Sequence, residues 1–239
     1  MKQHHYVAIA SVTATLGATL FLAGCPGNNP SPTPTATPST GPTATPNLAK
    51  EYLFPHKLDG TYTYDWVTIT ALPGGTETAT DSSALVLKTT KLTSTEAVVT
   101  ATVDNVPYAT VSMVVKNNGI ELTRQEKPNT NGPIVTTKEL YTNDTFTEAG
   151  TVVTTATGSM GAVTMKRVGA ESVTAATESF NTLKLQSLEA TPNATPKFKW
   201  VAKGMGYLGV KSTEVSTSSA NGGGIATDST EILLKSYTK

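Results

Sequence analysis

Cysteine is almost absent from this sequence of 239 residues, which contains only Cys25. A lone cysteine excludes an internal disulfide, so burial and backbone pairing must stabilise the fold without one. Histidine is also scarce: His4, His5 and His56 are too few to build a typical zinc site. An excess of one charge is missing as well, because 18 basic residues face 18 acidic ones. The sequence therefore predicts no nucleic-acid partner, no metal and no other cofactor.

The first 25 residues carry an export signal. Lys2 gives a short positive start, and residues 7–23 form an uncharged run of the length expected for the core of a signal peptide. The run ends in the tetrapeptide LAGC, residues 22–25, which matches the bacterial lipobox. We therefore predict a lipoprotein signal peptide over residues 1–24 and lipidation on the Cys25 thiol. A transmembrane anchor and an ordinary secretory peptide are the alternatives, although the run is short for a membrane span.

Lipidation of Cys25 predicts where the protein resides. Acyl chains such as palmitate attach a protein firmly, because each buried CH₂ group contributes about 0.8 kcal/mol. We expect a bacterial cell-envelope lipoprotein that is anchored to the membrane and does not span it. Pro26 follows the cysteine, in place of the aspartate that is associated with inner-membrane retention in some bacteria. This favours the outer membrane where the cell has one.

Residues 25–49 are predicted to form a tether. The stretch from residue 26 to residue 46 reads PGNNPSPTPTATPSTGPTATP and holds seven of the fourteen prolines. This composition cannot bury a hydrophobic core, and proline favours extended polyproline II. At about 3.1 Å per residue, such a tether would hold the following domain roughly 60 Å from the bilayer.

Residues 50–239 are predicted to form a single β domain. Threonine and valine dominate, and apolar and polar residues alternate with the period of a strand. The sequence NNG at residues 117–119 signals a hairpin turn, and no long window shows the spacing of a helix. We expect an all-β antiparallel meander that curves into an open barrel, a half-barrel or a sandwich. The expected strands are residues 62–70, 96–103, 108–115, 119–125, 134–141, 151–156, 162–168, 171–176, 182–188, 197–202, 209–216 and 230–237.

Three glycines near the end of the chain have the spacing of a dinucleotide-binding loop, G-x-G-x-x-G: Gly204, Gly206 and Gly209. Such a loop needs a helix after it, whose N-terminus holds the pyrophosphate. Here the following residues, VKSTEVSTSS, are β-branched and rich in serine. We therefore predict a tight passage between two strands, in which Gly204 and Gly206 supply backbone freedom, with Trp200 and Tyr207 packed nearby.

Three longer stretches are similar to one group of bacterial lipoproteins. They are EYLFPHKLDGTYTYDW at residues 51–66, VGAESVTAATESFNTLKL at residues 168–185 and WVAKGMGYLGVKS at residues 200–212. In order and spacing they resemble the DUF3108 and TapB-like lipoprotein domains, although Tyr62 stands where tryptophan is usual. The resemblance implies an all-β, curved-sheet envelope protein and brings no general activity with it.

Few residues offer catalytic chemistry. After removal of the signal peptide, His56 is the only histidine left to act as a base, and Asp59 lies three residues away. Two carboxylate pairs, Asp59 with Asp65 and Glu171 with Glu178, have the residue types that a glycosidase needs. The other candidate acids and amides are expected to be turn residues; they are Asp81, Asp104, Asn143, Asp144 and Asp228.

The aromatic residues allow two interpretations: they form the core of the sheet, or they line an apolar pocket for a lipid or glycan chain. They are Tyr62, Tyr64, Trp66, Tyr108, Phe180, Phe198, Trp200 and Tyr207. The first interpretation, which we favour, predicts a non-enzymatic envelope lipoprotein whose β domain binds an envelope protein or has a structural role. The second predicts a carrier or chaperone of a hydrophobic ligand, and a glycan hydrolase is a third, less favoured, hypothesis.

Overall fold

The computed structural model describes residues 46–72, 78–127, 133–147, 150, 152–158, 161–189, 197–219 and 225–238. All of them belong to the unit that spans Thr45–Lys239. The helices are α1 (Leu48–Leu53) and α2 (Asp144–Thr147), and neither is long and apolar enough to cross a membrane. The strands are β1 (Thr61–Ala71), β2 (Thr78–Leu92), β3 (Glu96–Val103), β4 (Val106–Lys116), β5 (Gly119–Glu126), β6 (Val135–Thr142), β7 (Val152–Gly158), β8 (Gly161–Ala175), β9 (Glu178–Glu189), β10 (Lys197–Val201), β11 (Lys211–Ser219) and β12 (Ile225–Tyr237).

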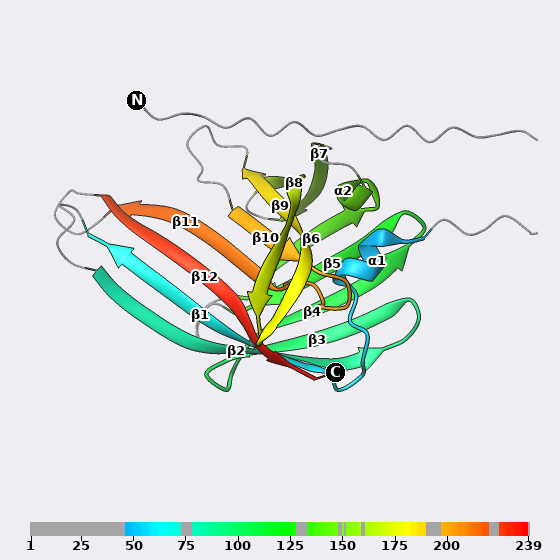
Figure 1. Ribbon diagram of the computed structural model, residues 1–239, viewed down its shortest axis with the longest axis horizontal. Helices are drawn as coiled ribbons and strands as arrows, with labels where there is room; N and C mark the ends of the chain where they lie inside the picture. Colours follow the sequence, from blue (N-terminus) through cyan, green and yellow to red (C-terminus); the bar gives the residue numbers. More distant parts are fainter. Residues whose placement is uncertain are drawn as a thin grey trace, which may run out of the picture. The chain divides into compact units, whose positions relative to one another are not determined.

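The strands form one sheet in the order β6-β5-β4-β3-β2-β1-β12-β11-β10-β9-β8-β7. Strands that are consecutive in the chain pair antiparallel, except that among the described residues β6 and β7 do not pair, and β1 also pairs with β12. Figure 1 shows this central pair, cyan and red, within a strongly curved sheet. The edge strands β6 and β7 lie close to one another without forming a ladder among the described residues. The prediction of an antiparallel meander is confirmed, and the sheet is curled into a half-barrel.

Tight turns explain why neighbouring strands pair. Asp104 and Asn105 between β3 and β4 have φ values of 49° and 66°, and Ala176 and Thr177 between β8 and β9 have 48° and 64°. Two consecutive residues with positive φ match the twist of an antiparallel hairpin. The turn predicted at residues 117–119 joins β4 to β5 as expected.

Two strand predictions need correction. Strand β2 was not predicted, because its sequence TATDSSALVLKTTKL has polar residues on both faces. Its buried alternation covers Leu85, Leu87 and Thr89, and the last of these is polar. Residues 162–168 and 171–176 were expected to be separate strands but form the single strand β8. The glycine between them, Gly169, lies at a register shift in the β8–β9 ladder, so the strand bends without ending.

Alternation on β1 defines the two faces of the sheet. Tyr62 and Tyr64 are buried, and Trp66, Thr68 and Thr70 follow on the same side. We call this side of the sheet the inner face, and we use the term for the side chains of all strands that point to the same side. It carries the hydrophobic core, whose largest fully buried side chains are Tyr64, Tyr141, Leu53, Met113, Ile120, Leu185 and Leu234.

Helix α1 covers part of the inner face beside β5. The Asn47 side chain accepts a hydrogen bond from the Lys50 amide (3.0 Å) and donates to the carbonyls of Lys116 (3.0 Å) and Gly119 (3.1 Å). It therefore caps the helix and ties it to the β4–β5 turn. Ala49 is fully buried, so the ordered domain includes residues that composition had assigned to the end of the tether.

Candidate functional site on the inner face

The glycine-rich segment, residues 202–210, connects β10 to β11 and lies against the inner face. Gly204, Gly206 and Gly209 have φ values of 82°, 72° and 73°, a region that favours glycine. A strand, β11, follows Gly209, where a pyrophosphate-binding loop would have a helix. The predicted role of Gly204 and Gly206 in a passage between strands is confirmed.

Hydrogen bonds from β1 and α1 fix this segment. The Tyr62 hydroxyl donates to the Gly204 carbonyl (3.1 Å), and the buried Tyr64 hydroxyl donates to the Gly209 carbonyl (2.9 Å). The Gly204 amide in turn donates to the carbonyl of Glu51 in α1 (3.0 Å). The segment is therefore a built-in part of the core.

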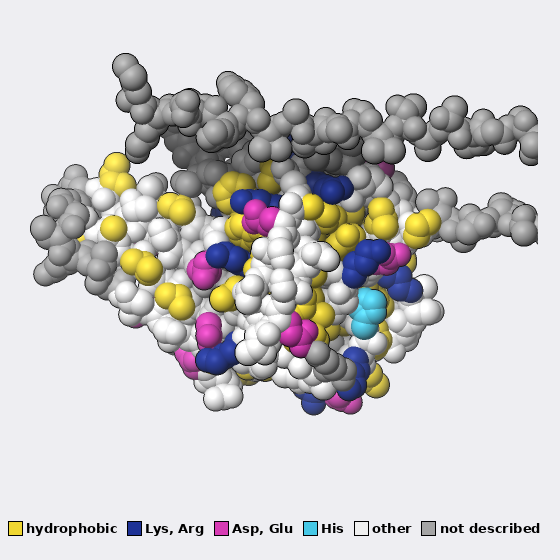
Figure 2. Space-filling view, viewed as in Figure 1, with side chains coloured by type: hydrophobic (Ala, Val, Ile, Leu, Met, Phe, Trp, Pro, Cys, Tyr) yellow, Lys and Arg dark blue, Asp and Glu magenta, His cyan; other side chains and the backbone are white. Residues whose placement is uncertain are grey.

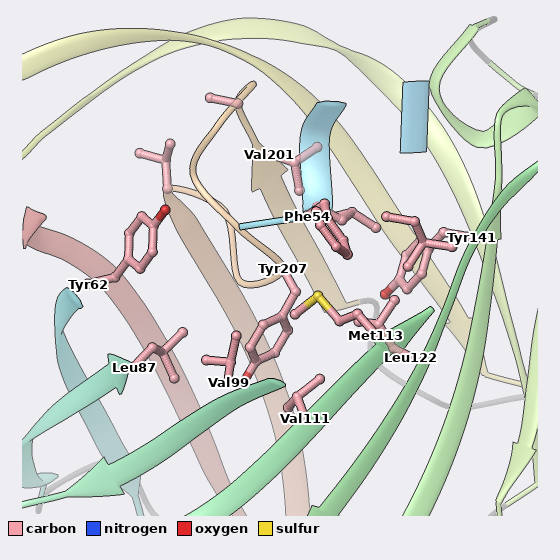
Figure 3. Close-up of a cluster of buried hydrophobic side chains, with 14 of the residues drawn as sticks. Phe54, Tyr62, Leu87, Val99, Val111, Met113, Leu122, Tyr141, Val201 and Tyr207 are labelled. Carbon is pink, nitrogen blue, oxygen red and sulfur yellow. The ribbon is translucent and has the colours of Figure 1, made fainter. Parts of the chain in front are cut away.

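Tyr207 lies at the centre of the hydrophobic core on the inner face (Figure 3). Its side chain is buried and lies between Val99, Val111 and Met113 of the strands and Phe54 beside α1 (Figure 3). The residues of the core cluster come from α1, α2, the 202–210 segment and ten of the twelve strands. In the described part of the chain, the apolar region of the inner face is thus filled by the protein's own side chains.

A group of polar and aromatic side chains lies at the boundary of this filled region, and we call it the inner-face cluster. The Arg124 Nη2 atom lies 2.5 Å from Glu126 Oε1. Lys199 Nζ donates to the Tyr207 carbonyl (3.1 Å) and lies 3.5 Å from the Tyr141 hydroxyl. The cluster comprises Trp66, Tyr108, Arg124, Glu126, Glu139, Tyr141 and Lys199.

A bulge explains how Tyr108 enters the cluster. In the β3–β4 ladder Ala101 pairs with Ala109 and Thr102 with Pro107, so the register passes over Tyr108. The Tyr108 ring then meets Trp66 of β1 edge-on, with centroids 5.7 Å apart and planes at 71°. Both side chains are only partly buried and pack against the core.

Burial and neighbouring charges shift the titration of the cluster. Burial raises the pKa of Tyr108 to about 12, and the Glu126 carboxylate adds to that increase. Burial lowers the pKa of Lys199, with the nearby Arg124 charge acting in the same direction and Glu139 opposing it. These side chains therefore interact electrostatically across β4, β5, β6 and β10, which face each other because the sheet curls.

Polar side chains continue along the inner face beyond the cluster. The Thr68 and Thr230 hydroxyls are 3.1 Å apart, and the Thr70 hydroxyl donates to Asp228 Oδ1 (2.6 Å). Asp228 was expected in a turn but lies in β12, and Asp81, expected likewise, lies in β2. Both prove compatible with a strand because polar residues occupy both faces of the sheet at this end.

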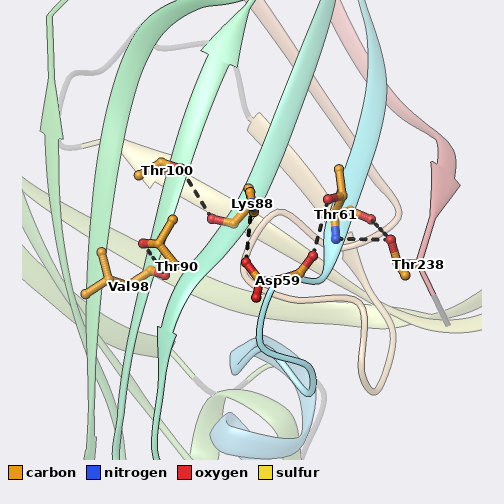
Figure 4. A network of polar contacts seen from close by, with 7 residues as sticks. All are labelled: Asp59, Thr61, Lys88, Thr90, Val98, Thr100 and Thr238. Carbon is orange, nitrogen blue, oxygen red and sulfur yellow. Dashed lines mark hydrogen bonds and ion pairs between the residues drawn. The ribbon is translucent and has the colours of Figure 1, made fainter.

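His56, the one histidine that could act as a base, and Asp59, the nearby acid, have different surroundings in the structure. His56 is exposed and lines a small open cleft of about 280 Å³ beside α1. Asp59 forms an ion pair with Lys88 (3.3 Å) within a polar network that joins the start of β1 to the end of the domain (Figure 4). The cleft is lined by Lys50, Glu51, Phe54, Pro55, His56, Leu92 and Thr93.

The candidate carboxylate pairs are also held apart. Asp65 binds Lys235 (2.9 Å), whereas Asp59 binds Lys88. Glu178 pairs with Ala175 in the β8–β9 ladder, four residues from Glu171. Since a strand rises about 3.3 Å per residue, this places the two glutamates about 13 Å apart. Carboxylates that cooperate in glycoside hydrolysis are separated by roughly 5–9.5 Å.

Most of the predicted aromatic residues belong to the core, as our favoured interpretation expected. Tyr62, Tyr64, Trp200 and Tyr207 are buried, and Trp66, Tyr108 and Phe180 are partly buried against the core. Phe198 lies partly buried beside Trp200, with Lys184 Nζ 4.8 Å from its ring centroid. Sequence reasoning missed the charged members of the inner-face cluster, Arg124, Glu126, Glu139 and Lys199. Their signal is weak: charged residues continue the inward positions of a strand after its apolar residues end.

Figure 2 shows the molecule in space-filling form, viewed as in Figure 1. Apolar side chains gather near the centre of the view, and acidic and basic side chains lie next to each other around them. Among the described residues, no group of three or more His, Cys, Asp or Glu side chains is placed to hold a metal ion. The predicted signal peptide, the lipidation site Cys25 and nearly all of the tether lie outside the described residues.

Alkaline titration should report on the filled interior. Burial raises the pKa values of Tyr64, Tyr141 and Tyr207 above the ordinary value of 10.0. Their stabilising contribution is complete below about pH 10 and is lost as the pH rises toward the folded-state pKa values. We expect their phenolate absorbance to appear only with unfolding, above about pH 11. The control is urea-unfolded protein, and folded protein in which every tyrosine ionises near pH 10 would contradict the prediction.

Comparison with known protein families and with curated proteins finds no match for the chain, so the resemblance to the DUF3108 and TapB-like domains stays a prediction. Among solved structures, the chain is similar to a proposed exported protein with a YmcC-like fold from Bacteroides fragilis (14% identity, TM-score 0.40, 79% of this chain and 100% of that chain). It is also similar to a proposed lipoprotein from Parabacteroides distasonis, with 10% identity and a TM-score of 0.40 over 79% of this chain and 99% of that chain. A DUF1329 family protein from Desulfovibrio piger is more distant, with 9% identity and a TM-score of 0.24 over 76% of this chain and 85% of that chain. At these TM-scores the likenesses bear on no ligand, partner or activity.

Proposed function

We propose that the protein is a cell-envelope lipoprotein whose β domain, tethered to the membrane through Cys25, binds a partner without catalysis. The observation that carries this proposal is the filled interior. A carrier of lipid needs an apolar hollow, but Tyr207, the 202–210 segment and α1 occupy that space in the described domain. What the inner face leaves partly accessible is the polar and aromatic cluster around Trp66 and Arg124, apart from the buried Tyr141. Recognition at this surface fits the geometry better than enclosure of a ligand.

The proposed location of the protein in the cell envelope is based on the N-terminal sequence. The lipobox at residues 22–25 and the sole cysteine favour acylation, and the proline-rich stretch after it favours a spacer. Pro26 favours the outer membrane in a cell that has one. Two acyl chains or more would hold the protein at the bilayer, while the domain remains free to meet a partner in the envelope.

Metabolic labelling with radioactive palmitate tests the anchor. We expect label in the wild-type protein and in the Ser31→Ala control, whose change lies in the tether, and none in Cys25→Ser. The Cys25→Ser protein should also move from the membrane fraction to the soluble fraction. Label that persists after the cysteine is replaced would contradict the proposed anchor, whatever the β domain binds.

A further inference from the structure

We propose that the inner-face cluster is a binding site for a neutral, hydroxyl-rich glycan chain. This inference deepens the proposed function, on which it rests, by naming the class of ligand. Three features of the described residues lead to it: a partly exposed aromatic pair, a balanced set of charged hydrogen-bonding groups, and a line of hydroxyl side chains that continues from them.

The aromatic pair supplies the apolar contact. Because Trp66 and Tyr108 meet at 71°, neither ring covers both faces of the other. Both residues are partly exposed, and the aromatic face carries the negative part of the ring quadrupole. The C–H groups on one face of a sugar ring are apolar and slightly positive, so they stack on such a surface, whereas the sugar hydroxyls point to its rim.

The charged groups next to the rings match those hydroxyls. Arg124 and Lys199 are donors, and Glu126 and Glu139 are acceptors. The Arg124 side chain is 37% exposed, so its guanidinium is in part accessible to a ligand as a hydrogen-bond donor. Two positive and two negative charges cancel, so the cluster does not favour an anionic phosphate or acidic polymer.

Further polar side chains extend the surface in one direction. The Thr68–Thr230 pair and the Thr70–Asp228 pair follow Trp66 along β1 and β12. The ion pair of Lys197 with Glu214 (2.7 Å) joins β10 to β11, and Glu214 lies opposite Thr230 in the ladder. Two residues along a strand advance about 6.6 Å, which is similar to the length of one sugar unit. The arrangement therefore fits an oligosaccharide of a few units better than a single sugar.

The binding test uses the full-length protein in detergent on an array of neutral and acidic oligosaccharides. We expect retention of at least one neutral oligosaccharide, whose affinity is then measured by Trp66 fluorescence in a Trp200→Phe background, since the chain has two tryptophans. Trp66→Ala, measured on the array and by calorimetry, should weaken that binding about tenfold or more. The matched control is Val67→Ala, the next residue on β1, which points away from the inner face.

A second variant protects the test against loss of folding. The double change Arg124→Gln and Glu126→Gln removes both charges together, so neither charge is left without its partner, and the thermal unfolding midpoint should change little. It should weaken glycan binding by about tenfold as well. No retention of a neutral oligosaccharide, binding to acidic ones alone, or equal binding by wild type and both variants would overturn the proposal. These results would leave the palmitate labelling of Cys25 unchanged, so failure of the ligand class and failure of the anchor are distinguishable.

Discussion

Replacing Gly209 by alanine should destabilise the domain by about 3–5 kcal/mol or prevent folding. Gly209 has a φ of 73°, and a Cβ atom there would lie 2.3 Å from the Trp200 carbonyl oxygen. The left-handed conformation alone costs about 1–2 kcal/mol for a residue with a side chain. To relieve the clash the backbone must move, and this strains the hydrogen bonds from Val210 N to Trp200 O (2.8 Å) and from the Tyr64 hydroxyl to Gly209 O. Each is worth about 1 kcal/mol.

Gly169→Ala is the matched control for this prediction. It lies in β8, its φ is unexceptional, and a Cβ atom at that position meets nothing within 4 Å. We expect a change within about 1 kcal/mol, toward greater stability, because alanine restricts the unfolded chain more than glycine does. Urea unfolding followed by circular dichroism measures both variants. Similar midpoints for the two would show that the 202–210 segment is not held as tightly as its hydrogen bonds indicate.

The fold class could be predicted from the sequence because its signal is local. Alternation such as that of YTYDWVTIT specifies a strand and its inner face together, and Tyr62 and Tyr64 are buried as that pattern requires. Turns with positive φ, such as that at Asp104 and Asn105, then make neighbouring strands pair. Strand β2 escaped prediction because much of it is polar on both faces, and its place in the sheet is set by pairing with β1 and β3.

The site depended on information that is not local. Lys199 reaches Tyr141 across 58 residues of sequence, and the Tyr64 hydroxyl reaches Gly209 across 145. The pairing of β1 with β12 and the curl of the sheet bring these groups together, and neither can be read from a short window. For the same reason the glycine spacing at residues 204–209 predicted a turn correctly but did not show that this turn fills the domain's interior.

Replacing Tyr207 by alanine is the second change for which we expect a large effect, a loss of about 3–5 kcal/mol. Its ring fills the centre of the core, with Phe54 and Met113 among its neighbours (Figure 3). Removal of the ring takes away its own burial and leaves a space that well-packed strands cannot fully close. Tyr207→Phe is the control, since it keeps the ring, and its stability should change by about 1 kcal/mol or less. Thermal unfolding, compared at one pH below 9, measures both.

The same variant also separates recognition at a surface from transport of a lipid. A space lined by apolar side chains stays dry and binds small apolar molecules, so Tyr207→Ala should gain binding of an apolar fluorescent dye that the wild type lacks. The comparison is made under conditions in which circular dichroism shows the variant folded, because unfolded protein also binds such dyes. If the wild type and Tyr207→Phe bind the dye as strongly as Tyr207→Ala, an apolar space already exists in solution. The function of the domain would then be better explained by the carrier hypothesis than by recognition at a surface, because a hydrophobic ligand requires a cavity that exists without mutation.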